Sequence, residues 1–172
     1  VVIVSHSHHD HCSPEDIAKA SKDDTTLIAP TETLANLHAA NGIGAGERVT
    51  INAATVEAVA AYNIDKQFHP KATGWLGFVV TLSGRRVYYA GDTDRIPEMS
   101  DLADVDAALL PVGGTYTLNA AEAARAAADI GCRVAVPYHW GDIVGSEADA
   151  EAFADAAPCE VRILRPGEKT TL

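Results

Sequence analysis

The chain has 172 residues, of which 47% are hydrophobic and 22% charged, proportions typical of a folded domain rather than a disordered segment. Its formal net charge of −11 repels phosphate backbones and anionic lipids, so we expect neither a nucleic-acid-binding protein nor a membrane-surface protein. No apolar run approaches the roughly 20 residues that span a bilayer.

The cysteine content points to a reducing compartment. Cys12, Cys132 and Cys159 are too few for a disulfide scaffold, and three cysteines cannot all pair within one chain. No signal peptide is visible, and we therefore expect a cytoplasmic protein. The sequence has no initiator methionine and begins inside an apolar run at residues 1–4, which favours a fragment that lacks a natural N-terminal portion.

The first half of the chain alternates short apolar runs with helix signals. Ser13-Pro14-Glu15 predicts the start of a helix, because serine caps helices, proline suits the first turn and acids face the positive end of the dipole. A second helix is expected from Thr31 to about Ala40, followed by a flexible glycine-rich turn over residues 41–46. Strands are expected at residues 1–4, 27–30, 48–51 and 55–62.

The second half continues in the same manner. Ser83-Gly84 is a two-residue hairpin signal between strands expected at residues 76–82 and 85–90. Asn119-x-x-Glu122 resembles a capping box and predicts a helix that ends near Ile130. The remaining strands are expected at 105–111, 134–137 and 161–164, with a helix at 146–156. Because helices and strands alternate without a linker or a repeat, we expect a single layered α/β domain over residues 1–172.

The string His6-x-His8-x-Asp10-His11 places four metal-binding side chain types within six residues. On an extended segment His6 and His8 point the same way, because side chains alternate with a period of two. Asp10 and His11 follow the strand end, where the backbone can turn them toward a second point. The string can therefore supply two ligands to each of two adjacent ions, and its donors suit Zn²⁺, Mn²⁺ or Fe. A chance polar loop is the competing interpretation, but so dense a cluster is far rarer than a lone histidine.

This string, following a short strand, resembles the signature of the metallo-β-lactamase fold superfamily. The segment around Gly91-Asp92-Thr93 is similar to the Gly-Asp-Thr segment of that superfamily, and His139 is similar to its last histidine ligand. The resemblance implies a four-layer αββα sandwich, part of whose N-terminal sheet would be missing here. It extends over nearly the whole chain, and its motifs are specific for the fold rather than for a substrate.

One branch of the superfamily is particularly similar, namely small metal-dependent hydrolases such as the ascorbate-6-phosphate lactonases and the phospholipase-D-like phosphodiesterases. The segments that carry this likeness are 77–93, 108–114 and 164–168. The resemblance implies two divalent ions, with zinc favoured over Mn²⁺ or Fe, and a metal-bound hydroxide that attacks a lactone or phosphodiester. Asp92 would bridge the ions and complete the second site with Asp10, His11 and His139, and Asp10 would also orient the nucleophile as the catalytic residue. The expected partner is a small-molecule substrate, and an anionic substrate and a homo-oligomer are both compatible with the sequence.

The third histidine of the first metal site has no clear counterpart. Related hydrolases carry it at the end of the strand that corresponds to residues 55–62, where this chain has Asn63. Either His69 completes the site, which we prefer, or the first ion is held loosely by two histidines and oxygen ligands. If the site is weak, the alternative function is a metal- or ligand-binding protein without turnover. The predicted metal ligands are His6, His8, Asp10, His11, His69, Asp92 and His139.

Several other polar and aromatic residues have plainer interpretations. Asp94 is expected to support its neighbour Asp92 or to cap a helix. Cys12 is expected to be a small buried residue rather than a thiolate ligand. The aromatic pair Tyr138 and Trp140 either lines a pocket or belongs to the core. His38 is expected to be structural or exposed within the second helix.

Overall fold

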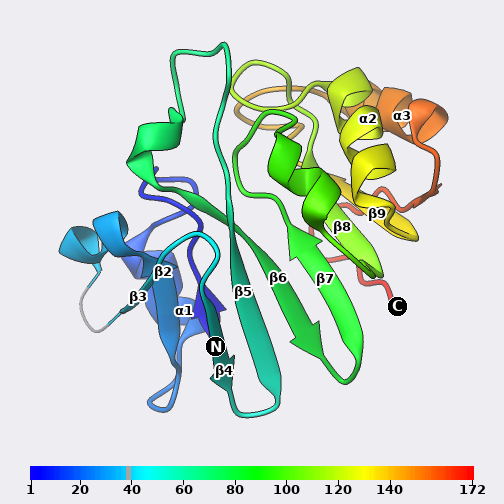
Figure 1. Ribbon diagram of the computed structural model, residues 1–172. Helices are drawn as coiled ribbons and strands as arrows, with labels where there is room; N and C mark the ends of the chain where they lie inside the picture. The colour runs from blue at the N-terminus through cyan, green and yellow to red at the C-terminus, as the bar shows by residue number, and fades with distance from the viewer. Residues whose placement is uncertain (38–39) are drawn as a thin grey trace.

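The strands of the protein form two sheets, as the computed structural model shows for residues 1–37 and 40–172 (Figure 1). The smaller sheet is parallel throughout and consists of β1 (Val2–Ile3), β2 (Leu27–Pro30) and β3 (Asn41–Ile43). The larger sheet has the order β10-β9-β8-β7-β6-β5-β4. Its strands are β4 (Arg48–Ile51), β5 (Ala54–Ala60), β6 (Leu76–Leu82), β7 (Arg85–Tyr89), β8 (Ala107–Pro111), β9 (Val134–Tyr138) and β10 (Glu160–Val161). Pairing is antiparallel from β4 to β7 and parallel from β7 to β10.

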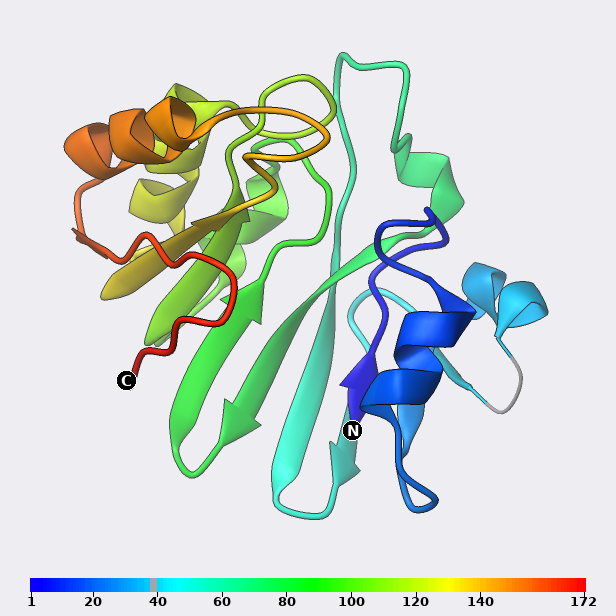
Figure 2. The same cartoon turned by 180° about the vertical axis from the view of Figure 1, so that it is seen from behind.

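The two faces of the larger sheet meet different layers because side chains alternate along each strand. Phe78 of β6 packs against Ile28 and Ile43 of the smaller sheet, whereas its neighbour Val79 belongs to the main core on the opposite face. The flanking helices are α1 (Pro14–Ala20), α2 (Ala120–Ile130) and α3 (Glu147–Ala156). Helix α1 covers the outer side of the smaller sheet through Ile17, as Figure 2 shows from behind. The predicted four-layer αββα sandwich is confirmed.

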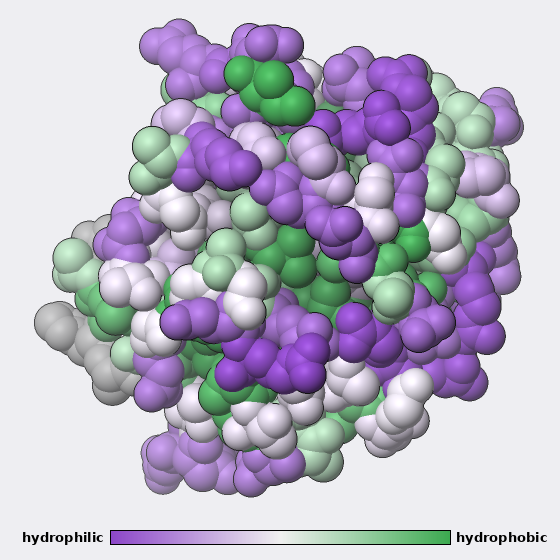
Figure 3. Space-filling view, viewed as in Figure 1, coloured by the Kyte–Doolittle hydropathy of each residue, from purple (hydrophilic) through white to green (hydrophobic). Residues whose placement is uncertain are grey.

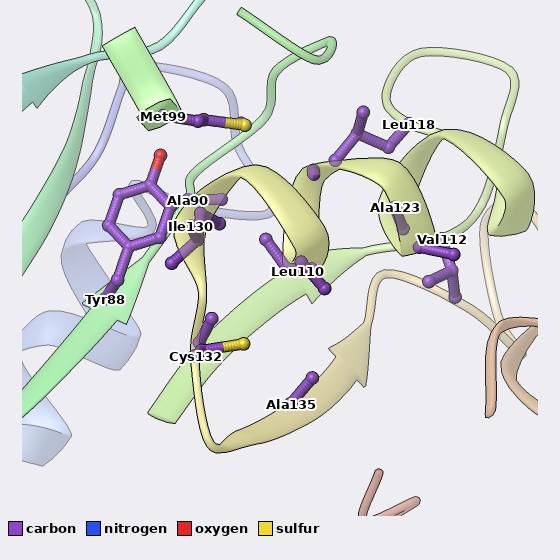
Figure 4. Packing of buried hydrophobic residues seen from close by; sticks show 14 of the residues in the cluster. Tyr88, Ala90, Met99, Leu110, Val112, Leu118, Ala123, Ile130, Cys132 and Ala135 are labelled. Carbon is purple, nitrogen blue, oxygen red and sulfur yellow. The ribbon is translucent and has the colours of Figure 1, made fainter. Parts of the chain in front are cut away.

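The main core lies between the larger sheet and helices α2 and α3. Figure 4 shows Leu110 and Ala135 from the sheet beside Ala123 and Ile130 of α2, and all four are nearly inaccessible to solvent. The alanine-rich inner side of α2 lets the helix lie close to the strands. Each large apolar side chain buried in this way contributes about 1.5–3 kcal/mol to stability.

Local signals placed most elements correctly. Ser13 caps α1 by accepting a hydrogen bond from the backbone N–H of Asp16. At the start of α2, Asn119 and Glu122 each accept a bond from the other's backbone N–H, at 3.0 and 2.9 Å. The hairpin residue Ser83 has φ 51° and the following glycine has φ 76°, as a tight two-residue turn requires.

Two expectations between residues 31 and 46 are wrong. Thr31–Asn36 form a 3₁₀ helix rather than an α-helix, and the backbone at Leu37 is already extended. Residues 41–43 form strand β3 instead of a flexible turn. Ile43 is 5% exposed, and pairing with β2 places it against the larger sheet, so burial overrides the turn preference of the preceding asparagine and glycine. The expectation for His38 falls outside the described residues.

Three smaller differences concern short elements. The expected strand at 161–164 is represented by the shorter β10, which begins one residue earlier. Short 3₁₀ helices at Lys71–Thr73 and Pro97–Asp101 were not anticipated. In the described part of the chain, no helix has both the length and the apolar character of a membrane span.

One edge of the larger sheet collects the loops that carry the chemistry. Because β5 and β7 are both antiparallel to β6, and β8 and β9 are parallel to β7, the segments after β5, β7, β8 and β9 all leave the sheet at the same edge, which is the upper one in Figure 1. The loop after β1 reaches this edge as well, since the backbone N–H of Leu76 donates to the carbonyl of Ser5 at 3.0 Å. Ligand sites of α/β sheets commonly lie at such an edge.

Candidate metal centre

The seven predicted site residues converge at this edge from four separate segments. The loop after β1 supplies four of them, and His69, Asp92 and His139 come from the segments before β6, after β7 and after β9. They form two groups, in each of which one ligand atom per residue lies within 4.8 Å of all the others. The first group is His6, His8, His69 and Asp92, and the second is Asp10, His11 and His139.

Asp92 lies between the two groups. Its Oδ2 is 3.5 Å from the Nε2 of His69 and 3.4 Å from the Nε2 of His139, and its Oδ1 is 3.3 Å from the Nε2 of His11. The Nε2 of His6 is 3.9 Å from Oδ2. Ligand atoms about 2.0–2.2 Å from a tetrahedral zinc ion lie roughly 3.3–3.6 Å apart, so the separations from His69, His139 and His11 match shared ligation and that from His6 is slightly longer.

The chemistry of the donors also fits a cation. The Nε2 atoms of His6 and His139 and the Oδ1 of Asp92 are buried, and within the described residues they have no hydrogen-bond partner. Buried polar atoms are normally paired, so several unpaired lone pairs directed at one another indicate a missing positive charge. That these residues ligate metal remains a prediction that this geometry supports.

The position of His69 bears on the question that the sequence left open. His69 belongs to the first group, and its ring centroid lies 5.0 Å from that of His6 and 4.6 Å from that of His8. The side-chain amide of Asn63 instead donates hydrogen bonds to the backbone carbonyls of Phe68, at 2.9 Å, and Tyr116, at 2.7 Å. Asn63 thus holds the loop that presents His69.

Two histidines are oriented by hydroxyl groups on their far side. The Nδ1 of His6 is 2.9 Å from the Oγ of Ser5, and the Nδ1 of His11 is 3.1 Å from the hydroxyl of Tyr89. A proton on each Nδ1 satisfies these contacts and leaves the Nε2 lone pair directed into the site. Such outer contacts fix the tautomer and ring orientation of ligand histidines.

Burial and mutual proximity set the charge states of the site. Burial, reinforced by His11, lowers the pKa of His6 to about 2, and burial lowers that of His69 to about 4. Burial alone would raise the pKa of Asp92, but His139 and His11 outweigh it and hold that pKa at about 2. The neutral imidazoles and the ionised carboxylate are the forms that bind metal.

His139 differs from the other histidines. The carboxylate of Asp92, 3.4 Å from its Nε2, raises its pKa, against the opposing effect of burial. Among the histidines of the site, His139 is therefore the one at which a metal ion would compete with a proton for the ring nitrogen.

Close backbone contacts position Asp92 and His139. Gly91 has φ 67°, and a Cβ there would lie 2.7 Å from the carbonyl oxygen of Leu76. The hydroxyl of Tyr138 donates to the carbonyl of Gly91, which joins the ends of β7 and β9. A side chain at Gly113 would collide with the backbone oxygen of His139. Glycine at these positions lets the ligand-bearing segments approach one another.

The neighbouring residues resolve several alternatives. Asp94 accepts from the backbone N–H of Ile64 and pairs with Lys66, so it fastens the loop that leads to His69, in keeping with a supporting role. Cys12 is buried in the core beneath α1 and belongs to neither ligand group. Tyr138 and Trp140 both line cavities beside the site, and Trp140 also packs against the main core.

Trp75 and Tyr89 are the site residues that sequence analysis missed. The ring of Trp75 lies 4.9, 4.7 and 5.0 Å from those of His6, His8 and His69, and so forms a wall for the first group. Tyr89 contacts His11 as described above. Tyr89 lies three residues before Asp92, but no local pattern distinguishes either aromatic residue from a core residue.

A cavity of about 310 Å³ opens onto the two groups. Its lining consists of His8, His9, Asp10, Phe68, His69, Asp92, Tyr116, His139 and Ile143. His9 is exposed at its edge. Since the cavity contacts both groups, a small molecule bound there would meet both metal positions.

Comparison with known proteins gives the class first. The family described as the beta-lactamase superfamily domain matches residues 1–140. The chain therefore belongs to the metallo-β-lactamase superfamily, as its histidine string, its αββα layers and the placement of its site residues indicate.

Closer relatives define the family within that class. A UPF0173 metal-dependent hydrolase from Methanosphaerula palustris is 32% identical, covering 91% of this chain and 75% of the relative, and one from Symbiobacterium thermophilum is 32% identical, covering 99% and 81%. The crystal structure of a candidate metal-dependent hydrolase from Parabacteroides distasonis is 36% identical, covers 94% of this chain and 74% of its own, and superposes with a TM-score of 0.83. This protein is a member of the UPF0173 metal-dependent hydrolases.

Proposed function

We propose that this protein is a dinuclear hydrolase for a small lactone- or phosphodiester-type substrate, within the branch that includes the ascorbate-6-phosphate lactonases and the phospholipase-D-like phosphodiesterases. The observation that carries the proposal is the carboxylate of Asp92, which lies within 3.3–3.9 Å of four imidazole nitrogens from both ligand groups. A carboxylate shared in this way suits two adjacent ions.

The two groups divide the ligands between two metal positions. His6, His8 and His69 would hold the first ion, Asp10, His11 and His139 the second, and Asp92 both. Zinc is the favoured metal because imidazole and carboxylate donors at these separations match its tetrahedral preference, with Mn²⁺ or Fe as alternatives. When bound, two such ions supply Lewis acidity and a water whose pKa falls to about 7.

The chain's own residues complete the chemistry. The carboxylate of Asp10 contacts the Nε2 atoms of His11 and His139 at 3.4 and 3.6 Å, and its side chain is 34% exposed at the cavity. It can accept a hydrogen bond from an attacking water and so hold the water in line with the substrate. Asp92 remains ionised and balances the positive charge of the site.

The alternative of a binding protein without turnover depended on a weak first site. Its basis was Asn63 at the expected histidine position. His69 supplies the third imidazole of that group, and the amide of Asn63 is bonded to two backbone carbonyls. Hydrolysis therefore has the stronger support.

Zinc content and turnover test the proposal together. We expect about two zinc ions per chain in the wild type, about one in His69→Ala, and hydrolysis of γ-butyrolactone or bis(p-nitrophenyl) phosphate by the wild type. Leu82→Ser, at the far end of β6, should match the wild type in both respects and serves as the control. The proposal would be refuted if the wild type binds fewer than two zinc ions per chain, or if it hydrolyses neither of the two compounds.

A further inference from the structure

Part of the outer side of the cavity is apolar, in contrast to its histidine-lined floor. Phe68, Tyr116 and Ile143 form this part, here called the apolar rim. Phe68 is 46% exposed and Ile143 is 65% exposed, although both are large apolar residues. Figure 3 shows hydrophobic atoms among hydrophilic ones at the upper edge of the molecule, the edge from which the loops project in Figure 1. Exposed apolar side chains gathered at a cavity are typical of a ligand-binding surface.

The rim is held in place from below. The rings of Phe68 and Tyr116 meet edge to face with centroids 5.1 Å apart, a favourable aromatic geometry. The buried amide of Asn63 donates to the backbone carbonyls of both residues, so one side chain fixes the two loops that carry them. Two of the three rim residues are thus prearranged rather than free to collapse onto the site.

The cavity has no lysine or arginine side chain to attract an anion, as far as the described part of the chain goes. Basic side chains of nearby segments are already paired with carboxylates: Lys66 with Asp94, Lys71 with Glu98, and Arg165 with Glu147. With a formal net charge of −11, the protein also repels an anionic group that extends beyond the metal positions.

We propose that the substrate is an uncharged ester or lactone that carries an alkyl or aryl substituent, and that the apolar rim binds this substituent while the carbonyl faces the metal centre. The proposal rests on the hydrolysis proposed above for its reaction. In that reaction the water oxygen joins the carbonyl carbon, the ester C–O bond breaks, and a proton passes to the departing alkoxide. The cavity, at about 310 Å³, lies at the lower end of the roughly 300–1,000 Å³ typical of small-molecule sites, so the substituent is short.

A series of lactones that differ only in their side chain tests the rim. For zinc-loaded protein we expect kcat/KM to rise at least about tenfold from γ-butyrolactone to γ-octalactone, because a single methylene enclosed in an apolar pocket is worth about tenfold and the half-exposed rim encloses only part of the four-carbon chain. An analogue of γ-octalactone whose chain ends in a carboxylate should lose this gain. Phe68→Ser and Ile143→Ser should flatten the dependence on chain length. Leu82→Ser, which makes the same kind of change at a residue that is 51% exposed and distant from the cavity, should preserve it.

Binding provides a second measurement that needs no turnover. We use alkyl hydroxamic acids from acetohydroxamic to octanohydroxamic acid and measure their affinity by calorimetry. They should bind the zinc-loaded wild type more tightly as the chain lengthens, and this gain in affinity should be smaller in Ile143→Ser. Binding that strengthens with length without any lactone or phosphodiester hydrolysis would retain the rim and reject the proposed reaction. If neither hydrolysis nor binding depends on chain length, or if the carboxylate analogue is preferred, the rim does not bind the substituent. The proposed hydrolysis would then still stand. Absence of both hydroxamate binding and hydrolysis would reject both proposals.

Discussion

The two ligand groups are built differently, although they share Asp92. In the first group the side chains of His6 and His69 are only 1% and 2% exposed, and Trp75 packs against them. In the second group His11 and His139 are 10% and 8% exposed and Asp10 is 34% exposed. The first group is therefore the more deeply packed of the two, although His8 and His69 also line the cavity, whereas the second group is more exposed to solvent.

This difference in exposure assigns different roles to the two metal positions. Ligands fixed by packing hold an ion rigidly and exchange it slowly. Ligands at the cavity expose their ion to water and substrate, and they depend on loops that solvent can reach. We therefore expect the first position to be the more retentive and the second to be the one at which conditions and substitutions act first.

Asp92→Asn should have the largest effect, because it removes the feature that the groups share. The substitution keeps the shape of the side chain but removes its charge, so zinc affinity should fall at least about 100-fold at both positions and turnover should be lost. Isothermal titration calorimetry with zinc measures the two affinities, and circular dichroism should show an unchanged fold. If only one position weakens, Asp92 does not serve both ions.

A chelator should remove zinc from the two ligand groups at different rates. We expect a chelator to remove zinc from the wild type in a fast and a slow phase. His139→Ala should eliminate the fast phase and His6→Ala the slow phase, because the former belongs to the exposed group and the latter to the buried group. A zinc-sensitive dye in a stopped-flow instrument records both phases. A single phase, or the reverse assignment, would contradict the comparison.

Asp10→Asn should affect turnover more than binding. Its carboxylate is the most exposed ligand atom of the second group and the one placed to orient water, so kcat should fall about 10–100-fold. The slow phase of zinc release should remain unchanged. Steady-state kinetics on zinc-saturated protein checks the first expectation, and an unchanged kcat would exclude the orienting role.

Tyr89→Phe should have the smallest effect and act on the second group alone. It removes the hydroxyl 3.1 Å from the Nδ1 of His11, and loss of such a support typically weakens metal binding about 10-fold or more. Tyr88→Phe is the matched control, because the buried hydroxyl of Tyr88 has no hydrogen-bond partner within the described residues. Equal zinc affinities in the two variants would show that Tyr89 does not support His11.

Much of the site could be predicted because its signals are local. The string from His6 to His11 lies within one loop, and the expected division between its first and last pairs matches the two groups observed. Asp92 and His139 each directly follow an apolar strand, and a polar side chain at such a strand end is a local signal as well. Caps and the Ser83-Gly84 turn located their elements for the same reason.

Features that depend on distant contacts could not be predicted. The sequence left His69 and Asn63 as alternatives because the choice depends on the fold of the 63–70 loop, which Asp94 and Tyr116 help to fix. The supporting position of Trp75 arises only when the loop after β1 meets the start of β6. Strand β3 was mistaken for a turn because its pairing with β2 supplies a preference that its own residues lack.

The ligands also come from opposite sides of the sandwich. The loop from His6 to His11 continues from the smaller sheet, whereas His69, Asp92 and His139 extend from the larger one. Bound ions would therefore act as cross-links between two layers that otherwise adhere mainly through apolar packing. Metal at 100 times its dissociation constant adds about 2.7 kcal/mol to the stability of the state that binds it. After metal removal, amide hydrogens of β1, β2 and β3 should exchange faster while those of β8 and α2 remain protected, because the smaller sheet would then open as a separate cooperative unit.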